Sequence, residues 1–489
     1  MQHCRFLIIG AGPTGLGAAW RLRELNQDDW LILEAAPEAG GLARSFVDEK
    51  GFTWDIGGHV QFSHYDYFDR IMDSLLGPDG WNHHQRESWI WMRERFIPYP
   101  LQNNLHRLPA EDLDKCLQGL LDIATQPAER VPRSFRDWIL TRFGTGIADV
   151  FMFPYNFKVW AHEPAIMNAT WVGERVAPTD LRKVLRNLAY QTDDLAWGPN
   201  NTFRFPKRGG TGAIWKACSA RLPSSHQAYG CSVSSIDLEK RTLVLSDGSA
   251  FSYDVLLSTI PLTELIKLCG RADLHPIAER GLLSSSSNIV GLGMSGQPPQ
   301  ALRSKSWIYF PESNCPFYRV TVFSNYAEAN VPEPGSTWSL MLEVSESKHR
   351  AVDQQVLIDS VVDGAIATGL VNNTQQILSR WSYRAAHGYP VPGLQRDAAI
   401  SQLIPEFERY GVYSRGRFGL WRYEVSNQDH SFMQGVELVD HLINGRREIT
   451  AQDPDLANSK KHPWPFELWR QSSALREPEG KTASPAPLN

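Results

Sequence analysis

The sequence lacks the features that mark secreted, membrane-spanning and nucleic-acid-binding proteins. Its six cysteines form no CxxC pair and show no metal-like spacing, and a strand-like run replaces a signal sequence near the start. No apolar run approaches the roughly 20 residues of a membrane span. Lys and Arg number 49 against 54 Asp and Glu, so a basic excess is absent. We therefore expect a cytoplasmic protein without disulfides, bound metal, a membrane or a nucleic-acid partner.

A glycine fingerprint near the start of the chain indicates a dinucleotide site. Residues 6–9 are a run of four apolar side chains, which predicts a buried parallel strand. Gly10, Gly12 and Gly15 follow at the spacing that allows a tight turn and a close approach of backbone to a pyrophosphate. Pro13 and Thr14 complete this loop.

The surroundings of the fingerprint agree with this interpretation. Apolar residues at helical spacing predict a helix over 16–25, whose first N–H groups would face the phosphates. A second apolar run, 30–33, ends on Glu34, 19 residues after Gly15, where a carboxylate would accept from a ribose hydroxyl. The same glycine pattern recurs at 291–296, but Gln-Pro-Pro follows it. We expect only a strand end and a turn there.

The rest of the chain predicts further regions. From about 110 to 195 the apolar residues recur with a helical period, whereas 290–345 alternate like antiparallel strands and 89–98 resemble a hairpin. One fingerprint combined with several other glycine loops favours a stably held FAD over a dissociable nicotinamide. We predict an α/β fold with a discontinuous, Rossmann-like FAD-binding lobe (1–90, 200–290 and 405–450), a helical insert domain (105–199), an antiparallel β-sheet domain (291–404) and a disordered tail (477–489).

Longer stretches carry a resemblance to a known family. They include GGHVQFSHYDYFD at 57–69, GTGIADVFMFPYNFKVWA at 144–161, WGPNNTFRFPKRGGTG at 197–212 and GRFGLWRYEVSNQDHSFMQGVE at 416–437. The chain resembles the flavin-dependent UDP-galactopyranose mutases, and the fungal and other eukaryotic branch more than the bacterial one. The matching stretches run from the N-terminus to about residue 445.

This resemblance implies an isomerase that interconverts UDP-galactopyranose and UDP-galactofuranose with no net redox change. In the family, N5 of the reduced flavin attacks the anomeric carbon and displaces UDP, so the nucleophile belongs to the cofactor. The resemblance therefore implies FAD that is active when reduced, NADPH as the reductant, and a UDP-sugar as the substrate. A homo-oligomer is compatible with the sequence.

The resemblance also assigns catalytic and substrate-binding residues. Arg175 and Arg319 match the family's two diphosphate arginines, each charge-assisted bond contributing about 1.5–3 kcal/mol, and His59 matches the histidine of a mobile loop beside the flavin. A single tyrosine on a strand is more typical of core packing, but the matched set favours a ligand. Leu101 stands where we expect an aromatic residue, which implies some repacking of the nucleotide pocket. The further substrate-binding residues are Tyr99, Gln102, Phe151, Asn156, Trp160, Asn200, Tyr309, Tyr389, Tyr423 and Asn427.

Cofactor contacts are expected from the glycine loops and from matched positions. A helix that begins near Asn427 would point its N-terminus at the pyrimidine edge of the flavin and stabilise the anionic reduced form. Arg86 and Ser88 match positions that contact NADPH in fungal relatives. The expected FAD contacts are Gly10, Gly12, Pro13, Thr14, Gly15, Glu34, Gly41, Leu42, Arg44, Ser45, Gly57, Gly58, His59, Val233, Gly416, Arg417, Asn427 and Gln428.

Three alternatives remain open at the level of sequence. The nearest is a mutase for a different nucleotide sugar, because few contacts to the sugar hydroxyls are encoded. An oxidoreductase of the amine-oxidase type would share the FAD lobe, although paired arginines argue against an apolar amine pocket. A flavoprotein without activity, used as a binding module, is disfavoured because the set of diphosphate residues is complete.

Overall fold

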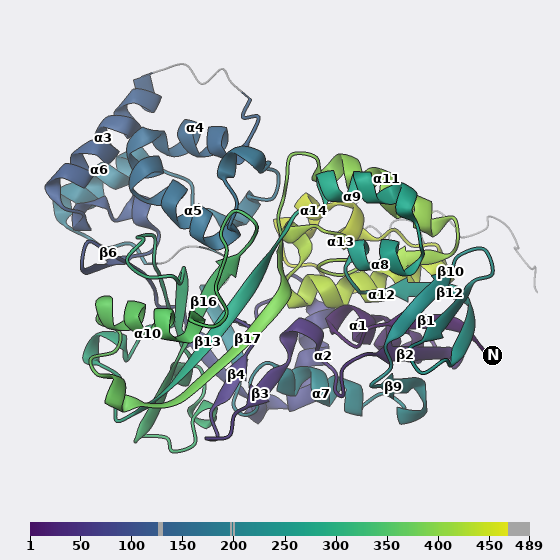
Figure 1. Cartoon of the computed structure of the whole chain (residues 1–489). Coiled ribbons are helices and arrows are strands. Elements are labelled where there is room, and N and C mark those ends of the chain that lie inside the picture. The colour runs from purple at the N-terminus through teal and green to yellow at the C-terminus, as the bar shows by residue number, and fades with distance from the viewer. Residues whose placement is uncertain (126–130, 196–197, 199–200, 468–489) are drawn as a thin grey trace, which may run out of the picture.

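A mainly parallel sheet, in which β10–β11 and β11–β12 pair antiparallel, and a large, mainly antiparallel sheet occupy opposite ends of the molecule (Figure 1). The computed structural model describes residues 1–125, 131–195, 198 and 201–467, with the backbone alone at 174. The parallel sheet lies beside the N-terminus, the antiparallel sheet lies at the far end, and the helices α3 to α6 stand over the latter (Figure 1). Within the described ranges, no helix is both long and apolar enough to cross a membrane.

The first sheet confirms the fingerprint strand and shows why it is so apolar. Phe6 and Ile8 pack into one hydrophobic cluster, whereas Leu7 and Ile9 pack into another on the opposite face. A strand buried on both faces reads as a continuous apolar run. The strand order is β10-β11-β12-β1-β2-β9, with β18 also on β12. The bounds are β1 Gln2–Ile9, β2 Trp30–Glu34, β9 Gln227–Tyr229, β10 Val233–Asp237, β11 Thr242–Leu245, β12 Ala250–Ser258 and β18 Val412–Ser414.

Helices cover both faces of this sheet. One face packs against α1 (Pro13–Glu24) and α12 (Gln428–Asn444), which confirm the helices expected after the fingerprint and from near Asn427. The remaining helices around this sheet are α2 (Asp66–Leu76), α7 (Gly212–Ala220), α8 (Leu262–Leu268), α9 (His275–Gly281), α11 (Arg396–Glu408), α13 (Ile449–Gln452) and α14 (Pro454–Ser459).

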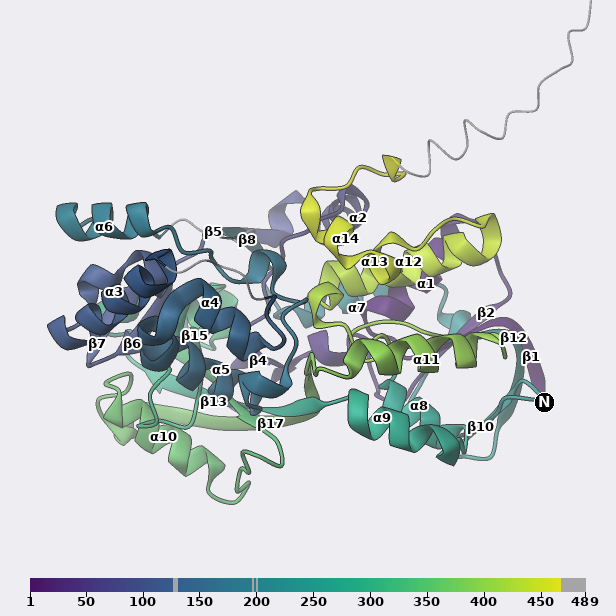
Figure 2. The same ribbon diagram turned by 90° about the horizontal axis from the view of Figure 1, so that it is seen from above.

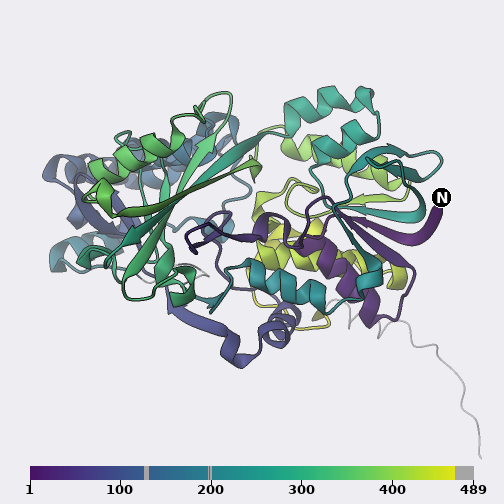
Figure 3. The same ribbon diagram turned by 60° about the horizontal axis from the view of Figure 1, so that its bottom comes forward.

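The second sheet has the order β17-β13-β16-β15-β14-β6-β7. Its pairings are antiparallel except for β14 with β6. The hairpin predicted at 89–98 is confirmed, and its pairing with β14 places it in this sheet. Figure 3 shows the two sheets end to end, with α10 (Leu357–Ala367) against the second. The bounds are β6 Ser88–Met92, β7 Arg95–Pro98, β13 Ser284–Ser295, β14 Trp307–Tyr309, β15 Arg319–Val322, β16 Thr337–Glu346 and β17 Ile377–Pro390.

The second glycine pattern, 291–296, lies at the end of β13 as predicted. A Cβ on Gly291 would lie 2.6 Å from the ring of Trp54, and one on Gly293 would lie 2.5 Å from the ring of Phe52. These glycines therefore make room for aromatic rings that pack flat on the strand, and no helix follows them.

The helical insert confirms the helical period read between 110 and 195. It contains α3 (Ala110–Thr125), α4 (Phe135–Ile147), a π-helical turn at 148–152, α5 (Phe153–Trp160) and α6 (Leu181–Tyr190). Its core is continuous with residues of β6 and β7, so the insert is fixed to the second sheet. Figure 2 shows the insert at one end and α11, α12 and the parallel sheet at the other.

Short strand pairs complete the fold. The pair β3 (Ser45–Val47) and β4 (Thr53–Asp55) carries a buried carboxylate, Asp55, which accepts hydrogen bonds from Ser45 Oγ at 2.5 Å and Thr211 Oγ1 at 2.7 Å. Burial raises the pKa of Asp55 to about 6 against these bonds. This carboxylate ties the β3–β4 pair to the loop before α7. The second pair is β5 (Trp81–Gln85) and β8 (Thr202–Pro206).

Candidate active site

A single cavity of about 660 Å³ collects most of the residues that the sequence predicts. Its lining comes from the fingerprint loop, the second sheet, the helical insert and the start of α12. This size and mixed lining are typical of a small-molecule site. The predicted residues that line it are Gly10, Gly12, Pro13, Thr14, Glu34, Gly41, Leu42, Arg44, Gly57, Gly58, His59, Arg86, Tyr99, Arg175, Tyr309, Arg319, Tyr389, Arg417, Tyr423, Asn427 and Gln428.

The fingerprint glycines have separate structural roles. Gly10 has φ +102°, and a Cβ there would lie 2.2 Å from Thr259 Oγ1. A Cβ on Gly15 would lie 1.9 Å from the carbonyl oxygen of Gly10, so Gly15 allows α1 to pack onto the turn. Gly12 meets nothing closer than 3.7 Å and lines the cavity. A pyrophosphate can therefore approach the backbone at Gly12 and the N-terminus of α1.

Glu34 closes the dinucleotide loop. One carboxylate oxygen accepts from the backbone N–H of Ala11 at 2.7 Å, and the other accepts from that of Ala36 at 2.7 Å. Each carboxylate oxygen can accept two bonds, so Glu34 keeps capacity for a ribose hydroxyl at the cavity wall.

His59 and Arg417 both line the cavity and lie close enough for their charges to interact. Burial, then the charges of Arg417 and Arg319, lower the pKa of His59 to about 4, against the opposing charge of Glu343. The imidazole is therefore neutral near pH 7, and its Nδ1 has no hydrogen-bond partner among the described residues. Arg417 lies 5.0 Å from the ring centroid of Tyr389 and donates to the carbonyl of Gly388.

Arg319 is held by a buried carboxylate. It stands opposite Glu343 in the pairing of β15 with β16, and Arg319 Nε donates to Glu343 Oε1 at 2.6 Å while Nη2 donates to Oε2 at 2.9 Å. Such a two-pronged pair fixes the plane of the guanidinium. Burial alone would raise the pKa of Glu343, but the charge of Arg319 lowers it below its usual value.

Arg175 reaches the cavity from the helical insert. It ends a short 3₁₀ turn, Gly173–Arg175, donates to the backbone carbonyl of Glu424 at 2.6 Å, and lies 5.6 Å from the ring centroid of Tyr423. This arginine bonds to a carbonyl in the distant 423–425 turn, whereas Arg319 bonds to a carboxylate within its own sheet.

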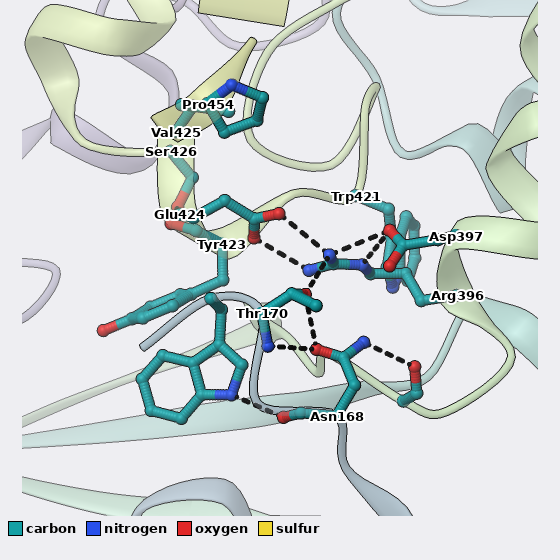
Figure 4. A network of polar contacts seen from close by, with 12 residues as sticks. Asn168, Thr170, Arg396, Asp397, Trp421, Tyr423, Glu424, Val425, Ser426 and Pro454 are labelled. Carbon is teal, nitrogen blue, oxygen red and sulfur yellow. Dashed lines mark hydrogen bonds and ion pairs between the residues drawn. The ribbon is translucent and has the colours of Figure 1, made fainter. Parts of the chain in front are cut away.

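A polar network supports the turn that receives Arg175 (Figure 4). Arg396 is buried and donates two hydrogen bonds of 2.8 Å to the carboxylate of Glu424. The hydroxyl of Thr170 accepts from Arg396 at 3.4 Å and donates to Asn168 at 2.8 Å. The network thus joins α11, the 423–425 turn and the segment of the insert that leads to Arg175.

Tyrosines form the wall between the two arginines. The rings of Tyr99 and Tyr309 contact edge to face at 5.1 Å, and those of Tyr389 and Tyr423 lie 5.8 Å apart. Burial raises the pKa of both Tyr309 and Tyr389. Neutral hydroxyls beside two guanidinium groups make a site suited to phosphate oxygens.

Comparisons with known proteins agree with this geometry. A family model described as flavin-containing amine oxidoreductase matches residues 13–333. A solved structure titled as a reduced UDP-galactopyranose mutase is 48% identical, with a TM-score of 0.91, over 96% of this chain and all of that one. The chain belongs to the UDP-galactopyranose mutase family. Membership makes it a flavoprotein enzyme of the isomerase class.

The solved structures under 25% identical share only the fold, and one sequence match is confined to a short segment. A putative protoporphyrinogen oxidase from Exiguobacterium sp. 255-15 is 16% identical, with a TM-score of 0.69, over 91% of this chain and 99% of that one. A fatty acid isomerase from P. acnes is 15% identical, with a TM-score of 0.60, over 90% of this chain and 99% of that one. A Baeyer-Villiger monooxygenase from Pseudomonas aeruginosa is 42% identical over 59 residues, which span only 11% of that protein and 12% of this chain.

Other residues expected from the mutase family do not line the cavity. Gln102 donates to the carbonyl of Ala177 at 2.7 Å, and Asn156 donates to that of Met152 at 2.7 Å. Their roles remain predictions, and Asn200 and the tail 477–489 lie outside the described residues. The predicted residues that are described but absent from the lining are Gly15, Ser45, Ser88, Gln102, Phe151, Asn156, Trp160, Val233 and Gly416.

Aromatic contacts connect the helical insert to the cavity. Phe151 stacks on Tyr155 at 5.2 Å, and Tyr155 contacts the edge of Tyr309 at 5.2 Å. Trp160 contacts Tyr423 at 4.9 Å. Sequence reasoning assigned no role to Tyr155, although it lies within the matched stretch 144–161.

Glu343 is the cavity residue that the sequence analysis missed most clearly. Its signal is a carboxylate inside the apolar run of β16, because a charged residue at a buried strand position needs a partner. No metal was expected, and among the described residues one group offers ligand atoms within 4.8 Å of one another: His64, Asp429 and His430. In that group Asp429 accepts from both the backbone and the ring of His64.

Proposed function

We propose that this mutase interconverts UDP-galactopyranose and UDP-galactofuranose with FAD in its reduced state. The observation that carries the proposal is one cavity lined by the dinucleotide fingerprint, by the two expected diphosphate arginines and by the expected substrate tyrosines Tyr99, Tyr309, Tyr389 and Tyr423. A flavin and a diphosphate bound in the same cavity would lie next to each other. This arrangement suits a reaction in which the cofactor contacts a nucleotide sugar directly.

The chain's own residues would retain the diphosphate. Because UDP leaves the anomeric carbon and later returns to it, the site must hold UDP while it is detached. Arg319 and Arg175 would bind the phosphate oxygens from opposite sides, and Tyr309, Tyr389 and Tyr423 would donate further hydrogen bonds. The tyrosine hydroxyls are neutral, so they add hydrogen bonds to the detached diphosphate without adding positive charge that would favour it over the sugar-bound form.

The residues present fit FAD. Gly12 leaves space at the N-terminus of α1, Glu34 keeps acceptor capacity, and Asn427 stands at the N-cap position of α12 with no capping bond from its side chain. When bound and reduced, the flavin supplies a nucleophilic nitrogen to the anomeric carbon. The N-terminus of α12 would favour negative charge on the reduced ring, and neutral His59 adds none of its own.

We further propose NADPH as the reductant, entering through the same cavity. The described residues contain no second competent dinucleotide fingerprint, since 291–296 is the end of β13. Arg86 lines the cavity with its guanidinium 5.9 Å from the ring centroid of Tyr99 and 6.0 Å from that of Trp307. Reductant and substrate would then compete for one site.

The decisive experiment is to reduce the protein with dithionite or NADPH, add UDP-galactofuranose, and separate the products by chromatography. The proposal requires UDP-galactopyranose to form, with no reductant consumed beyond the first reduction of the flavin. Failure to convert either isomer of UDP-galactose would reject this substrate. Competition binding with other UDP-, GDP- and dTDP-sugars would then identify another nucleotide sugar, whereas oxygen uptake in proportion to substrate loss would indicate an oxidase.

A further inference from the structure

Glu343 lines the cavity and contacts both the turn at 57–59 and Arg319. It lies in β16, between Ile289 of β13 and Arg319 of β15 in the strand register. Its side chain is only 2% exposed, yet it lines the cavity. A buried carboxylate at such a position is costly unless donors surround it.

Four hydrogen bonds satisfy the Glu343 carboxylate. Besides the two from Arg319, the hydroxyl of Tyr318 donates to Oε2 at 2.7 Å and the backbone N–H of Gly58 donates to Oε1 at 3.2 Å. Two carboxylate oxygens have about four acceptor positions, so all are in use. All four groups donate to Glu343. If glutamine replaced it, the amide N–H₂ would face two of these donors and could accept a hydrogen bond from neither.

The bond from Gly58 belongs to the turn that presents His59. Gly57 has φ +98°, and the N–H of His59 donates to the carbonyl of Gly57 at 2.8 Å. A Cβ on Gly58 would lie 2.7 Å from Thr321 Oγ1 and 3.7 Å from Cζ of Arg319. The turn at 57–59 therefore packs directly on the ion pair, and neither can shift without disturbing the other.

The same carboxylate sets the direction of the diphosphate arginine. A guanidinium has five N–H groups, and Glu343 takes two of them, so the other three remain for a ligand. Rotation of the Glu343 carboxylate would turn this fork and redirect the remaining donors.

We propose that Glu343 is a positioning residue that couples the flavin-side turn at 57–59 to the diphosphate arginine Arg319, so that nucleotide affinity depends on the oxidation state of the flavin. The inference rests on the proposed function, because it takes the flavin and the nucleotide to share this cavity. A change of charge on the flavin alters the environment of His59 and Gly58, and Glu343 transmits that change to Arg319. By thermodynamic reciprocity, nucleotide binding then shifts the reduction midpoint of the flavin by the same factor.

The test measures the dissociation constant of UDP for the FAD-loaded enzyme, oxidised and then reduced by dithionite. In the wild type we expect the two constants to differ by roughly fivefold or more, the usual lower range of coupling between sites. In Glu343→Gln the ratio should fall to within about twofold of unity, because the amide cannot hold Gly58 and Arg319 together. The UDP-induced shift of the flavin midpoint should shrink in parallel.

Glu346→Gln is the matched control. Glu346 lies on the same strand, three residues further on, and pairs with Arg384 outside the cavity lining. It should keep the wild-type ratio. If Glu343→Gln weakens UDP equally in both oxidation states, Glu343 only holds Arg319 and the coupling is rejected.

If Glu343→Gln fails to retain FAD, a second variant tests the coupling between flavin oxidation state and UDP affinity. Tyr318→Phe removes one donor to Glu343 and leaves every charge in place, so its affinity ratio should fall by roughly twofold or more. An unchanged ratio in that case rejects the coupling. A wild-type ratio of one also rejects it, even in an enzyme that converts UDP-galactofuranose. A redox-dependent ratio in a protein without mutase activity would instead reject the proposed reaction.

Discussion

The two diphosphate arginines differ in how the fold holds them. Arg319 lies in a central strand, and its guanidinium is fixed by Glu343 from the neighbouring strand. Arg175 ends a 3₁₀ turn of the helical insert and bonds to the backbone carbonyl of Glu424. One arginine is thus ordered before any ligand arrives, whereas the other depends on the contact between the insert and the 423–425 turn.

This difference suggests a division of work in the site. An arginine in a β-strand loses little conformational entropy when the ligand binds, because its side chain is already ordered. An arginine on a turn can change partner, from a carbonyl to a phosphate, as the nucleotide enters or leaves. We expect Arg319 to fix the position of the diphosphate and Arg175 to close over it.

The largest expected effect is on turnover. Arg319→Ala and Arg175→Ala should each lower kcat/KM by roughly 30- to 1,000-fold, since each removes about 2–4 kcal/mol of charge-assisted bonding to the diphosphate. Both variants should retain FAD, which absorbance of the purified protein would show. Wild-type turnover in either variant would remove that arginine from the site and end the comparison.

Stability should separate the two arginines. Arg319→Ala leaves Glu343 buried without its partner and should lower the free energy of unfolding by about 3–5 kcal/mol, whereas Arg175→Ala should change it by about 1 kcal/mol or less. Urea unfolding of FAD-loaded protein at pH 7 measures both. Equal losses would show that Arg175 is as deeply embedded in the fold as Arg319.

The pH dependence of this difference has a defined sign. In the wild type the pKa of Glu343 is lowered, so its contribution is present above the unfolded value of about 4.5 and is lost as the pH falls through the folded pKa. In Arg319→Ala burial raises that pKa, and the penalty is relieved when the carboxyl takes up a proton. The stability gap between wild type and Arg319→Ala should therefore narrow from pH 7 to about pH 4.5. A gap that widens on acidification would contradict the assigned pairing.

The support of Arg175 gives a further prediction. Arg396→Met breaks a buried ion pair with Glu424 and should cost about 3–5 kcal/mol of stability, as in Arg319→Ala. Because both diphosphate arginines remain, the variant should raise KM more than it lowers kcat. Steady-state kinetics on folded protein tests this, and a loss of kcat as large as in Arg175→Ala would show that the 423–425 turn acts directly in the chemistry.

The smallest expected effect concerns Thr170→Val. This change removes one hydroxyl between Arg396 and Asn168, which is worth about 1 kcal/mol. We expect KM to rise by roughly two- to fivefold with kcat unchanged. A larger loss would mean that the segment before Arg175 controls closure more strongly than its contacts suggest.

Much of the fold could be predicted because its signals are local. Residues 6–15 specify strand, turn and helix within one short stretch, and a strand buried on both faces is apolar throughout. The helical insert follows from its own period, and the hairpin at 89–98 from its own alternation. The partner of that hairpin could not be predicted, since β6 pairs in parallel with β14, more than 200 residues away along the chain.

In the candidate site, too, some features could be predicted from local sequence and others could not. Arg319 and Arg175 could be named from their motifs, but nothing near either one in sequence indicates what holds it. Glu343 lies 24 residues from Arg319, and Glu424 lies 249 residues from Arg175. Residue types and local periods fix which chemistry the chain can perform, because they depend on neighbours in sequence. Which carboxylate or carbonyl restrains each arginine depends on strand register and on how the insert packs, and only folding brings those groups together.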